Sequence, residues 1–126
     1  MAYSFRITED YCEASLALEK AGYAWTPRPG DWMLDRDDAS VGMLTLPVQD
    51  HAQVKRLNVH IPTYVQVSAM LENLEVREVR DREITFMLGD CVAARFGCDE
   101  FQADEGLCRL KALVAALQLK AQSPRA

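Results

Sequence analysis

The chain has 126 residues, of which 49% are hydrophobic and 26% are charged, with a formal net charge of −5. This length predicts one domain, residues 1–126, able to bury roughly 65% of its unfolded surface. The acidic balance argues against a nucleic-acid partner, because binding phosphate needs clustered Lys and Arg. No apolar run approaches the roughly 20 residues that cross a bilayer, and the N-terminus lacks a basic region followed by an apolar one. We therefore expect a cytoplasmic protein with no membrane contact.

The N-terminal part predicts a short strand followed by a helix. Residues 3–7 alternate in polarity, as a strand does. Thr8 is suited to cap a helix, and Gly22 stands where a glycine often follows one. The apolar face of this helix would consist of Tyr11, Ala14, Leu18 and Ala21.

The segment from Trp25 to Trp32 predicts a rigid loop, because two prolines and a glycine exclude regular structure in its middle. The favoured interpretation is a structural loop pinned by buried Trp. The alternative is a recognition loop, in which Arg28 stacks on Trp25 or Trp32 as a cation–π pair. Asp31 opens an acidic group without the Gly and Glu that a calcium-binding EF-hand loop requires, so we expect a solvated loop there.

The middle of the chain alternates between strand and helix patterns. Residues 32–34 and 41–46 predict strands that could form a hairpin, and residues 48–58 a helix. Pro62 fits the first turn of a further helix that runs to about Asn73. The long connection from residue 23 to 60 leaves two alternatives open, an excursion or a second small sheet.

Residues 82–97 give the strongest pattern of the chain, two strands joined by a tight turn. Ile84, Phe86 and Leu88 alternate, and so do Val92, Ala94 and Phe96. A three-residue loop, Gly89-Asp90-Cys91, pairs the two apolar sets, whereas a two-residue loop would set Ile84 against Arg95. We therefore predict the three-residue loop.

Two further elements complete this region. Residues 75–80 predict a strand added to the hairpin. The spacing of Leu107, Leu110, Val114 and Leu117 predicts a helix capped by Asp104, in which Gly106 costs about 1 kcal/mol of helix propensity. Residues 121–126 are expected to fray.

Residues 60–118 resemble small uncharacterised bacterial and phage-encoded proteins. The resemblance rests on the Ile-Pro-Thr start at 61–63, the Met-Leu-Glu at 70–72, and the Glu-Gly-Leu-Cys-Arg-Leu of the last helix. The chain departs from that pattern at Tyr64-Val65-Gln66. The resemblance implies a Pro-headed helix, short strands and a C-terminal amphipathic helix, with no established activity.

No motif identifies catalytic chemistry. The four cysteines form no Cys-x-x-Cys pair, which disfavours zinc, and we expect reduced thiols with Cys91 the most exposed. His51 and His60 would face opposite sides of a single helix, so they predict no metal pair. A Gly-rich phosphate loop and a Gly-x-Ser-x-Gly elbow are both absent from the sequence. We expect no metal and no cofactor.

The sequence thus predicts an α+β fold, a small antiparallel sheet with three to four helices packed on it. The favoured function is a non-enzymatic interaction or accessory protein that binds another protein or a second copy of itself. The alternative is a small enzyme whose site is assembled from scattered His, Asp and Arg residues of segment 25–60. The candidate binding residues are Trp25, Arg28, Asp31, Trp32, His51 and His60.

Overall fold

The structure is a computed structural model that describes residues 6–122. The strand expected over residues 3–7 lies almost wholly outside the described residues, as does the tail from 123 onward. Within them the elements in chain order are α1 (Glu9–Lys20), β1 (Trp32–Asp35), β2 (Val41–Met43), α2 (His51–Leu57), β3 (Asn58–Ile61), α3 (Tyr64–Asn73), β4 (Val76–Arg80), β5 (Glu83–Leu88), β6 (Cys91–Gly97), α4 (Cys98–Ala103) and α5 (Glu105–Gln122).

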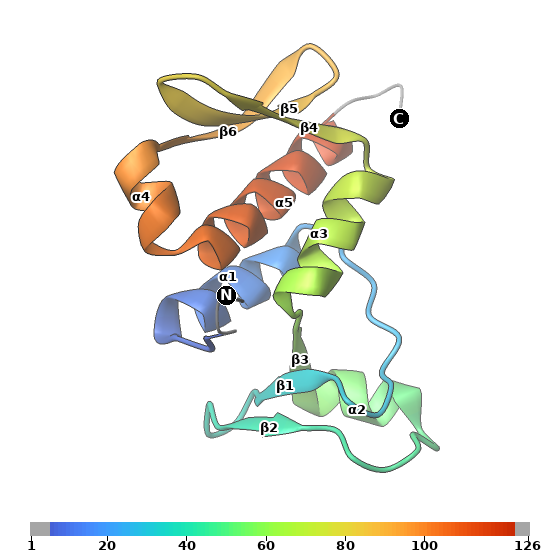
Figure 1. Cartoon of the computed structure of the whole chain (residues 1–126). Helices are drawn as coiled ribbons and strands as arrows, with labels where there is room; N and C mark the ends of the chain where they lie inside the picture. The colour runs from blue at the N-terminus through green and yellow to red at the C-terminus, as the bar shows by residue number, and fades with distance from the viewer. Residues whose placement is uncertain (1–5, 123–126) are drawn as a thin grey trace.

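The fold is α+β, with a layer of helices between two small antiparallel sheets (Figure 1). The first sheet, in the order β2-β1-β3, lies with α2 at one end of the molecule. The second sheet, in the order β4-β5-β6, lies over α5 at the opposite end of the molecule. Helices α1, α3 and α5 pack on one another between them. The helices of residues 6–122 thus number five, slightly more than expected. The 23–60 connection contains a second sheet rather than an excursion.

The first sheet contains one strand that the sequence did not predict. The hairpin of β1 and β2 is confirmed, but the helix expected over 48–58 ends at Leu57. Strand β3 follows directly and pairs antiparallel with β1, with Trp32 opposite Ile61 and Leu34 opposite Val59. The side chains of Val59 and Ile61 are buried, so this strand belongs to the core.

The predicted loop between β5 and β6 is wrong, and so is the pairing of Leu88 with Val92, but the other two predicted apolar pairs are correct. Leu88 pairs with Cys91, so the loop is the two-residue Gly89-Asp90, in which Gly89 has a φ of 62°. A bulge after Phe86 then restores the expected register, with Phe86 opposite Ala94 and Ile84 opposite Phe96. An extra residue in one strand of a bulge shifts the pairing in this way.

Side-chain caps explain where the long helices begin. Thr8 accepts a hydrogen bond from the backbone N–H of Tyr11, as expected. Thr63 and Gln66 form a reciprocal capping box at the start of α3, so Pro62 lies before the cap and not in the first turn. Asp104 accepts from the N–H of Leu107 at the start of α5, also as expected, and α5 continues through residue 121 to Gln122.

The core lies where α1, α3 and α5 meet the strands. Tyr11 of α1 is fully buried and donates a hydrogen bond to the carbonyl of Pro62 at 2.7 Å. Its ring packs edge-on against Tyr64, with 5.8 Å between the centroids. The ring of Tyr64 in turn covers Gly106 on α5, where a Cβ would stand only 1.9 Å from Cε1 of Tyr64. The glycine that weakens α5 therefore permits this close contact between α3 and α5.

Candidate functional site

Asp31 is the centre of a buried polar cluster that closes the loop before β1. Its Oδ2 accepts hydrogen bonds from the indole Nε1 of Trp25 and from the backbone N–H of Arg28, each at 3.0 Å. Its Oδ1 accepts from the side-chain amide of Gln66 at 3.1 Å. Three donors thus satisfy a carboxylate that is only 7% exposed. The cluster ties the loop to the N-terminal turn of α3.

His60 of β3 contacts the rings of two aromatic residues of the loop before β1. Its ring is parallel to that of Trp25, with 5.0 Å between centroids and 4° between planes, and Tyr23 stacks on it at 5.7 Å. The Tyr23 hydroxyl is 2.9 Å from Nδ1 of His60. Nε2 is 3.8 Å from Oδ1 of Asp31, which is too long for a hydrogen bond, and it is an unpaired buried atom within residues 6–122. The nearby carboxylate favours the tautomer with the proton on Nε2, in which Nδ1 accepts from Tyr23.

Burial sets the protonation states of this cluster. It lowers the pKa of His60 to about 4, against the opposing effect of Asp31, and it raises the pKa of Tyr23 to about 12. Burial alone would raise the pKa of Asp31, but the hydrogen bonds from Trp25, Gln66 and Arg28 outweigh it and hold that pKa below its ordinary value. At neutral pH the cluster therefore contains a carboxylate, a neutral imidazole and a neutral phenol.

The depressed pKa of His60 has a defined consequence for stability. The unfolded chain binds a proton at this residue below about pH 6.5, whereas the folded chain binds it only below about pH 4. Stability is therefore lost as the pH falls from about 6.5 to 4. The lowered pKa of Asp31 adds a loss at still lower pH, below the ordinary pKa of a carboxyl group.

A cavity of about 230 Å³ lies beside the His60 stack. Tyr23, Trp25 and His60 form its aromatic side, and α1 contributes Ser15 and Glu19. The remaining lining residues are Arg36 and Lys55. Arg36 forms an ion pair with Glu19 at 2.7 Å and also donates to the carbonyl of Lys55 at 2.9 Å. The cavity is smaller than the roughly 300–1,000 Å³ of ordinary ligand pockets.

The structure gathers some of the candidate residues and separates others. Trp25, Asp31 and His60 are in contact, and Arg28 joins them through its backbone N–H while its side chain stays exposed. The cation–π contacts of residues 6–122 involve Arg80 and Arg109, so they do not include the stacking of Arg28 on Trp25 or Trp32 that the alternative interpretation of the loop required. His51 is exposed in the first turn of α2, away from the buried His60.

Trp32 is half-buried in β1, opposite Ile61 and Met43. Sequence reasoning missed Tyr23 and Gln66. A signal existed for Gln66, because Thr63 followed three residues later by Gln is a capping-box pattern. None existed for Tyr23, whose contact with His60 spans 37 residues of sequence.

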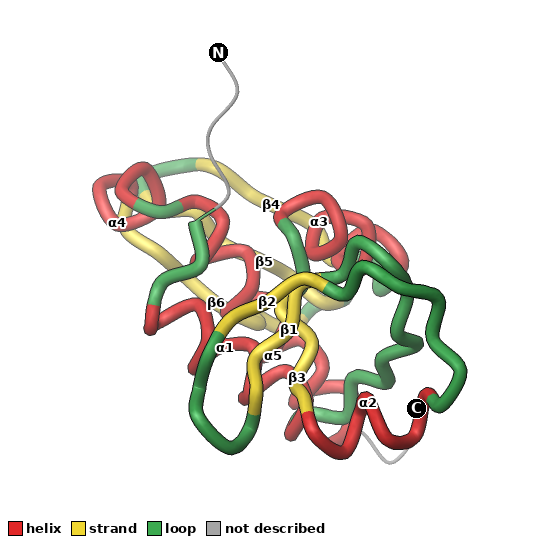
Figure 2. Tube along the Cα trace, turned by 90° about the horizontal axis from the view of Figure 1, so that it is seen from below, coloured by secondary structure: helices red, strands yellow, loops and turns green. Residues whose placement is uncertain are grey.

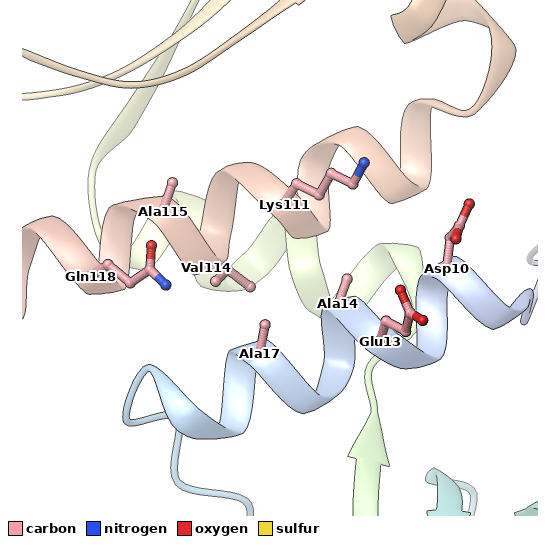
Figure 3. Close-up of a pocket in the computed structure, with 8 residues that line it drawn as sticks. All are labelled: Asp10, Glu13, Ala14, Ala17, Lys111, Val114, Ala115 and Gln118. Carbon is pink, nitrogen blue, oxygen red and sulfur yellow. The ribbon is translucent and has the colours of Figure 1, made fainter. Parts of the chain in front are cut away.

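The other hollows of the molecule are open and lie between helices or loops. A groove of about 370 Å³ lies between α1 and α5. Figure 3 shows the small side chains of Ala14 and Ala17 on α1 pointing toward α5, where Val114 points back toward α1. Small residues let two helices approach closely, so the packing of α1 against α5 explains the alanines at this groove. A second hollow, of about 270 Å³, is lined mostly by apolar residues such as Met70, Leu74 and Leu117.

The thiols and carboxylates indicate no metal centre within residues 6–122. No group of three His, Cys, Asp or Glu side chains there is placed to hold a metal ion.

All four cysteines are free. Cys91 is exposed, as expected, and so is Cys98, whereas burial raises the pKa of Cys12, and that of Cys108 to about 11. Within residues 6–122 no helix is long and apolar enough to cross a bilayer.

Comparison with known proteins assigns no relative. No family model, no curated protein and no solved structure matches this chain. The likeness of residues 60–118 to small bacterial and phage proteins therefore rests on its short motifs alone, and the function has to be argued from the geometry.

Proposed function

We propose that this chain is a non-enzymatic protein-interaction module, of the bacterial or phage type that its motifs resemble, which binds a protein through residues 41–57. The observation that carries the proposal is that most of the exposed large apolar side chains of residues 6–122 belong to this segment. Seven large apolar side chains are exposed within residues 6–122, and four of them belong to this segment: Val41, Met43, Leu46 and Leu57. Clustered exposed apolar side chains are typical of a protein-binding surface.

The shape of this segment supports the same proposal. A hollow of about 640 Å³ lies between the loop that follows β2 and the helix α2. Leu46 stands on its edge and is 72% exposed, with Leu44 and Val54 also in the lining. Figure 2, seen from below the first sheet, shows this loop and α2 at the periphery of the molecule. An apolar anchor residue of a partner fits such a hollow.

The enzyme alternative has less support. Its two histidines differ in their surroundings, because His51 is exposed and His60 is stacked inside the fold. The Tyr23–His60 pair borders a small cavity, but burial moves the pKa of each group away from neutrality. General acid–base catalysis works best with a group whose pKa lies near the working pH. Fixing the loop before β1 accounts for the contacts of the Asp31 cluster.

Affinity capture with charged variants tests the proposal. The tagged chain and the variant Leu46→Asp are used to capture proteins from an extract of the cells that make it. We expect the variant to recover the specific partner at least tenfold less, because a carboxylate would enter the apolar contact unpaired. The matched control is Val65→Asp on α3, since Val65 is 79% exposed but distant in sequence from the surface. Equal recovery by the native chain and both variants would refute the proposal.

A further inference from the structure

We propose that the open edge of β2 pairs with β2 of a second copy of this chain, antiparallel and symmetric about Gly42. This inference rests on the proposed function, because it uses the same surface, residues 41–57. It adds that the partner at the edge of β2 is a second copy of the chain. The paired strands would join two first sheets into one sheet of six strands. An interface of this kind is isologous, because the same patch serves both copies.

The hydrogen bonds of the hairpin determine which groups of β2 face outward. The N–H of Asp35 donates to the carbonyl of Ser40, and the N–H of Leu44 donates to the carbonyl of Asp31. Alternation along an antiparallel pair then directs the N–H and C=O of Gly42 toward β1, and those of Val41 and Met43 away from it. Strand β2 lies at the edge of its sheet, so these four groups are open to a partner strand.

The outward groups are self-complementary about Gly42. When two copies of β2 align antiparallel with Gly42 opposite Gly42, each Val41 stands opposite Met43 of the other copy. These are hydrogen-bonded positions, so each such pair exchanges two N–H···O=C bonds and the ladder gains four in all. Val41 and Met43 are each 42% exposed, and the pairing places apolar side chains against each other on one face of the sheet.

The charge pattern favours this edge over the edge strand β4 of the second sheet. Residues 39–45 carry no charged side chain, so two chains of net charge −5 meet there without opposed like charges. The edge strand β4 carries Arg77, Glu78 and Arg80 instead, which is how proteins protect an edge from pairing. A ladder this short buries less than the roughly 1,200 Å² of a standard interface, so the dimer is reversible, and its dissociation depends little on salt.

Disulfide trapping tests the predicted symmetry. Across a non-hydrogen-bonded pair the Cα atoms are about 4.5 Å apart, which a disulfide spans. Gly42→Cys, with the exposed Cys91 and Cys98 changed to Ser, should therefore form covalent dimers under mild oxidation. A side chain is tolerated at Gly42, because its φ is not positive and nothing lies within 4 Å of the added Cβ.

Thr45→Cys in the same background is the matched control. The symmetric register places the two copies of residue 45 six positions apart along the ladder, or about 20 Å. We expect Gly42→Cys to cross-link at least tenfold faster than Thr45→Cys. Equal rates, or no covalent dimer from Gly42→Cys, would overturn the register.

Sedimentation velocity from about 5 to 500 µM, a range suited to weak interfaces, tests the dimer without cysteines. Met43→Lys combined with Val41→Lys opposes like charges and should leave a monomer, whereas Met43→Lys combined with Val41→Glu opposes unlike charges and should restore the dimer. A native chain that stays monomeric, or two double variants that behave alike, would refute the dimer. The capture experiment with Leu46→Asp still decides the proposed function, so the two failures are distinguishable.

Discussion

Replacing Gly106 by Ala should destabilise the protein, although it improves the helix propensity of α5. In an exposed helix the change would gain about 1 kcal/mol, because Ala restricts the unfolded chain more than Gly does. Here the added Cβ would stand 1.9 Å from Cε1, 2.3 Å from Cζ and 2.4 Å from Cδ1 of Tyr64. Ordinary contact between carbon atoms needs about 3.5 Å or more. The ring or the helix must therefore move by more than 1 Å.

The surroundings leave little room for this movement. Tyr64 is only 7% exposed and packs against Tyr11, whose hydroxyl is fixed to the carbonyl of Pro62. Overpacking a core costs about 1–3 kcal/mol, and this clash involves three ring atoms, so we take the upper value of about 3 kcal/mol. Subtracting the propensity gain of about 1 kcal/mol leaves a net loss of about 2 kcal/mol. For a chain of this length that corresponds to a fall in Tm of about 8 °C.

Urea unfolding followed by circular dichroism measures the loss. Gly42→Ala is the control, because an added Cβ meets nothing within 4 Å there, and it should change the free energy of unfolding by less than about 0.5 kcal/mol. In a Tyr64→Leu background the flat ring is gone, and Gly106→Ala should become neutral or stabilising. A Gly106→Ala variant as stable as the native chain would refute the close packing of α3 on α5.

Further predictions concern the buried cluster and the thiols. From pH 7 to pH 5 the free energy of unfolding should fall by about 2 kcal/mol because of His60; chemical denaturation should show this fall in His51→Gln and not in His60→Gln. Asp31→Ala leaves three donors without an acceptor and should cost about 3 kcal/mol in the same assay, whereas Arg28→Ala keeps its backbone donor and should cost less than about 0.5 kcal/mol. Alkylation followed by mass spectrometry should modify Cys91 and Cys98 in the native protein. Cys12 and Cys108 should be modified only after unfolding.

The hairpin of β5 and β6 shows what a sequence pattern can and cannot determine. Matching apolar faces correctly placed Phe86 opposite Ala94 and Ile84 opposite Phe96. The predicted loop length is wrong because a bulge interrupts the ladder after Phe86. The bulge allows a two-residue turn together with the pairing of Phe86 with Ala94 and of Ile84 with Phe96. No residue type in this stretch predicts a bulge.

Helix ends were predictable where a side chain caps them, and the strand inside segment 48–61 was not. Thr8 and Asp104 cap helices as their residue types indicate. Asn58–Ile61 contains only four residues, and a short apolar run next to a helix has no period long enough to separate strand from helix. Its pairing with β1 is what makes it a strand.

The Asp31 cluster could be predicted only in part. The proline-rich loop and its buried Trp25 followed from local sequence, as did the structural interpretation of the loop. The meeting of Asp31 with Gln66 and the stacking of Trp25 on His60 join residues about 35 positions apart. Contacts of that range follow from the arrangement of the first sheet beside α3, which no local pattern specifies.

The two sheets stand at opposite ends of the helical layer (Figure 1), and we expect the first sheet to open at a lower free energy than the rest of the molecule. The first sheet meets the helices mainly where β3 packs against α1. Opening of the first sheet should therefore leave the hydrogen bonds of α5 and of the second sheet in place. Backbone amides of β1 and β3 should exchange with solvent at a lower opening free energy than those of the buried turns of α5. Pairing at β2 would slow amide exchange in the first sheet only. Amide exchange therefore reports whether the edge of β2 is occupied, because the second sheet should exchange at an unchanged rate.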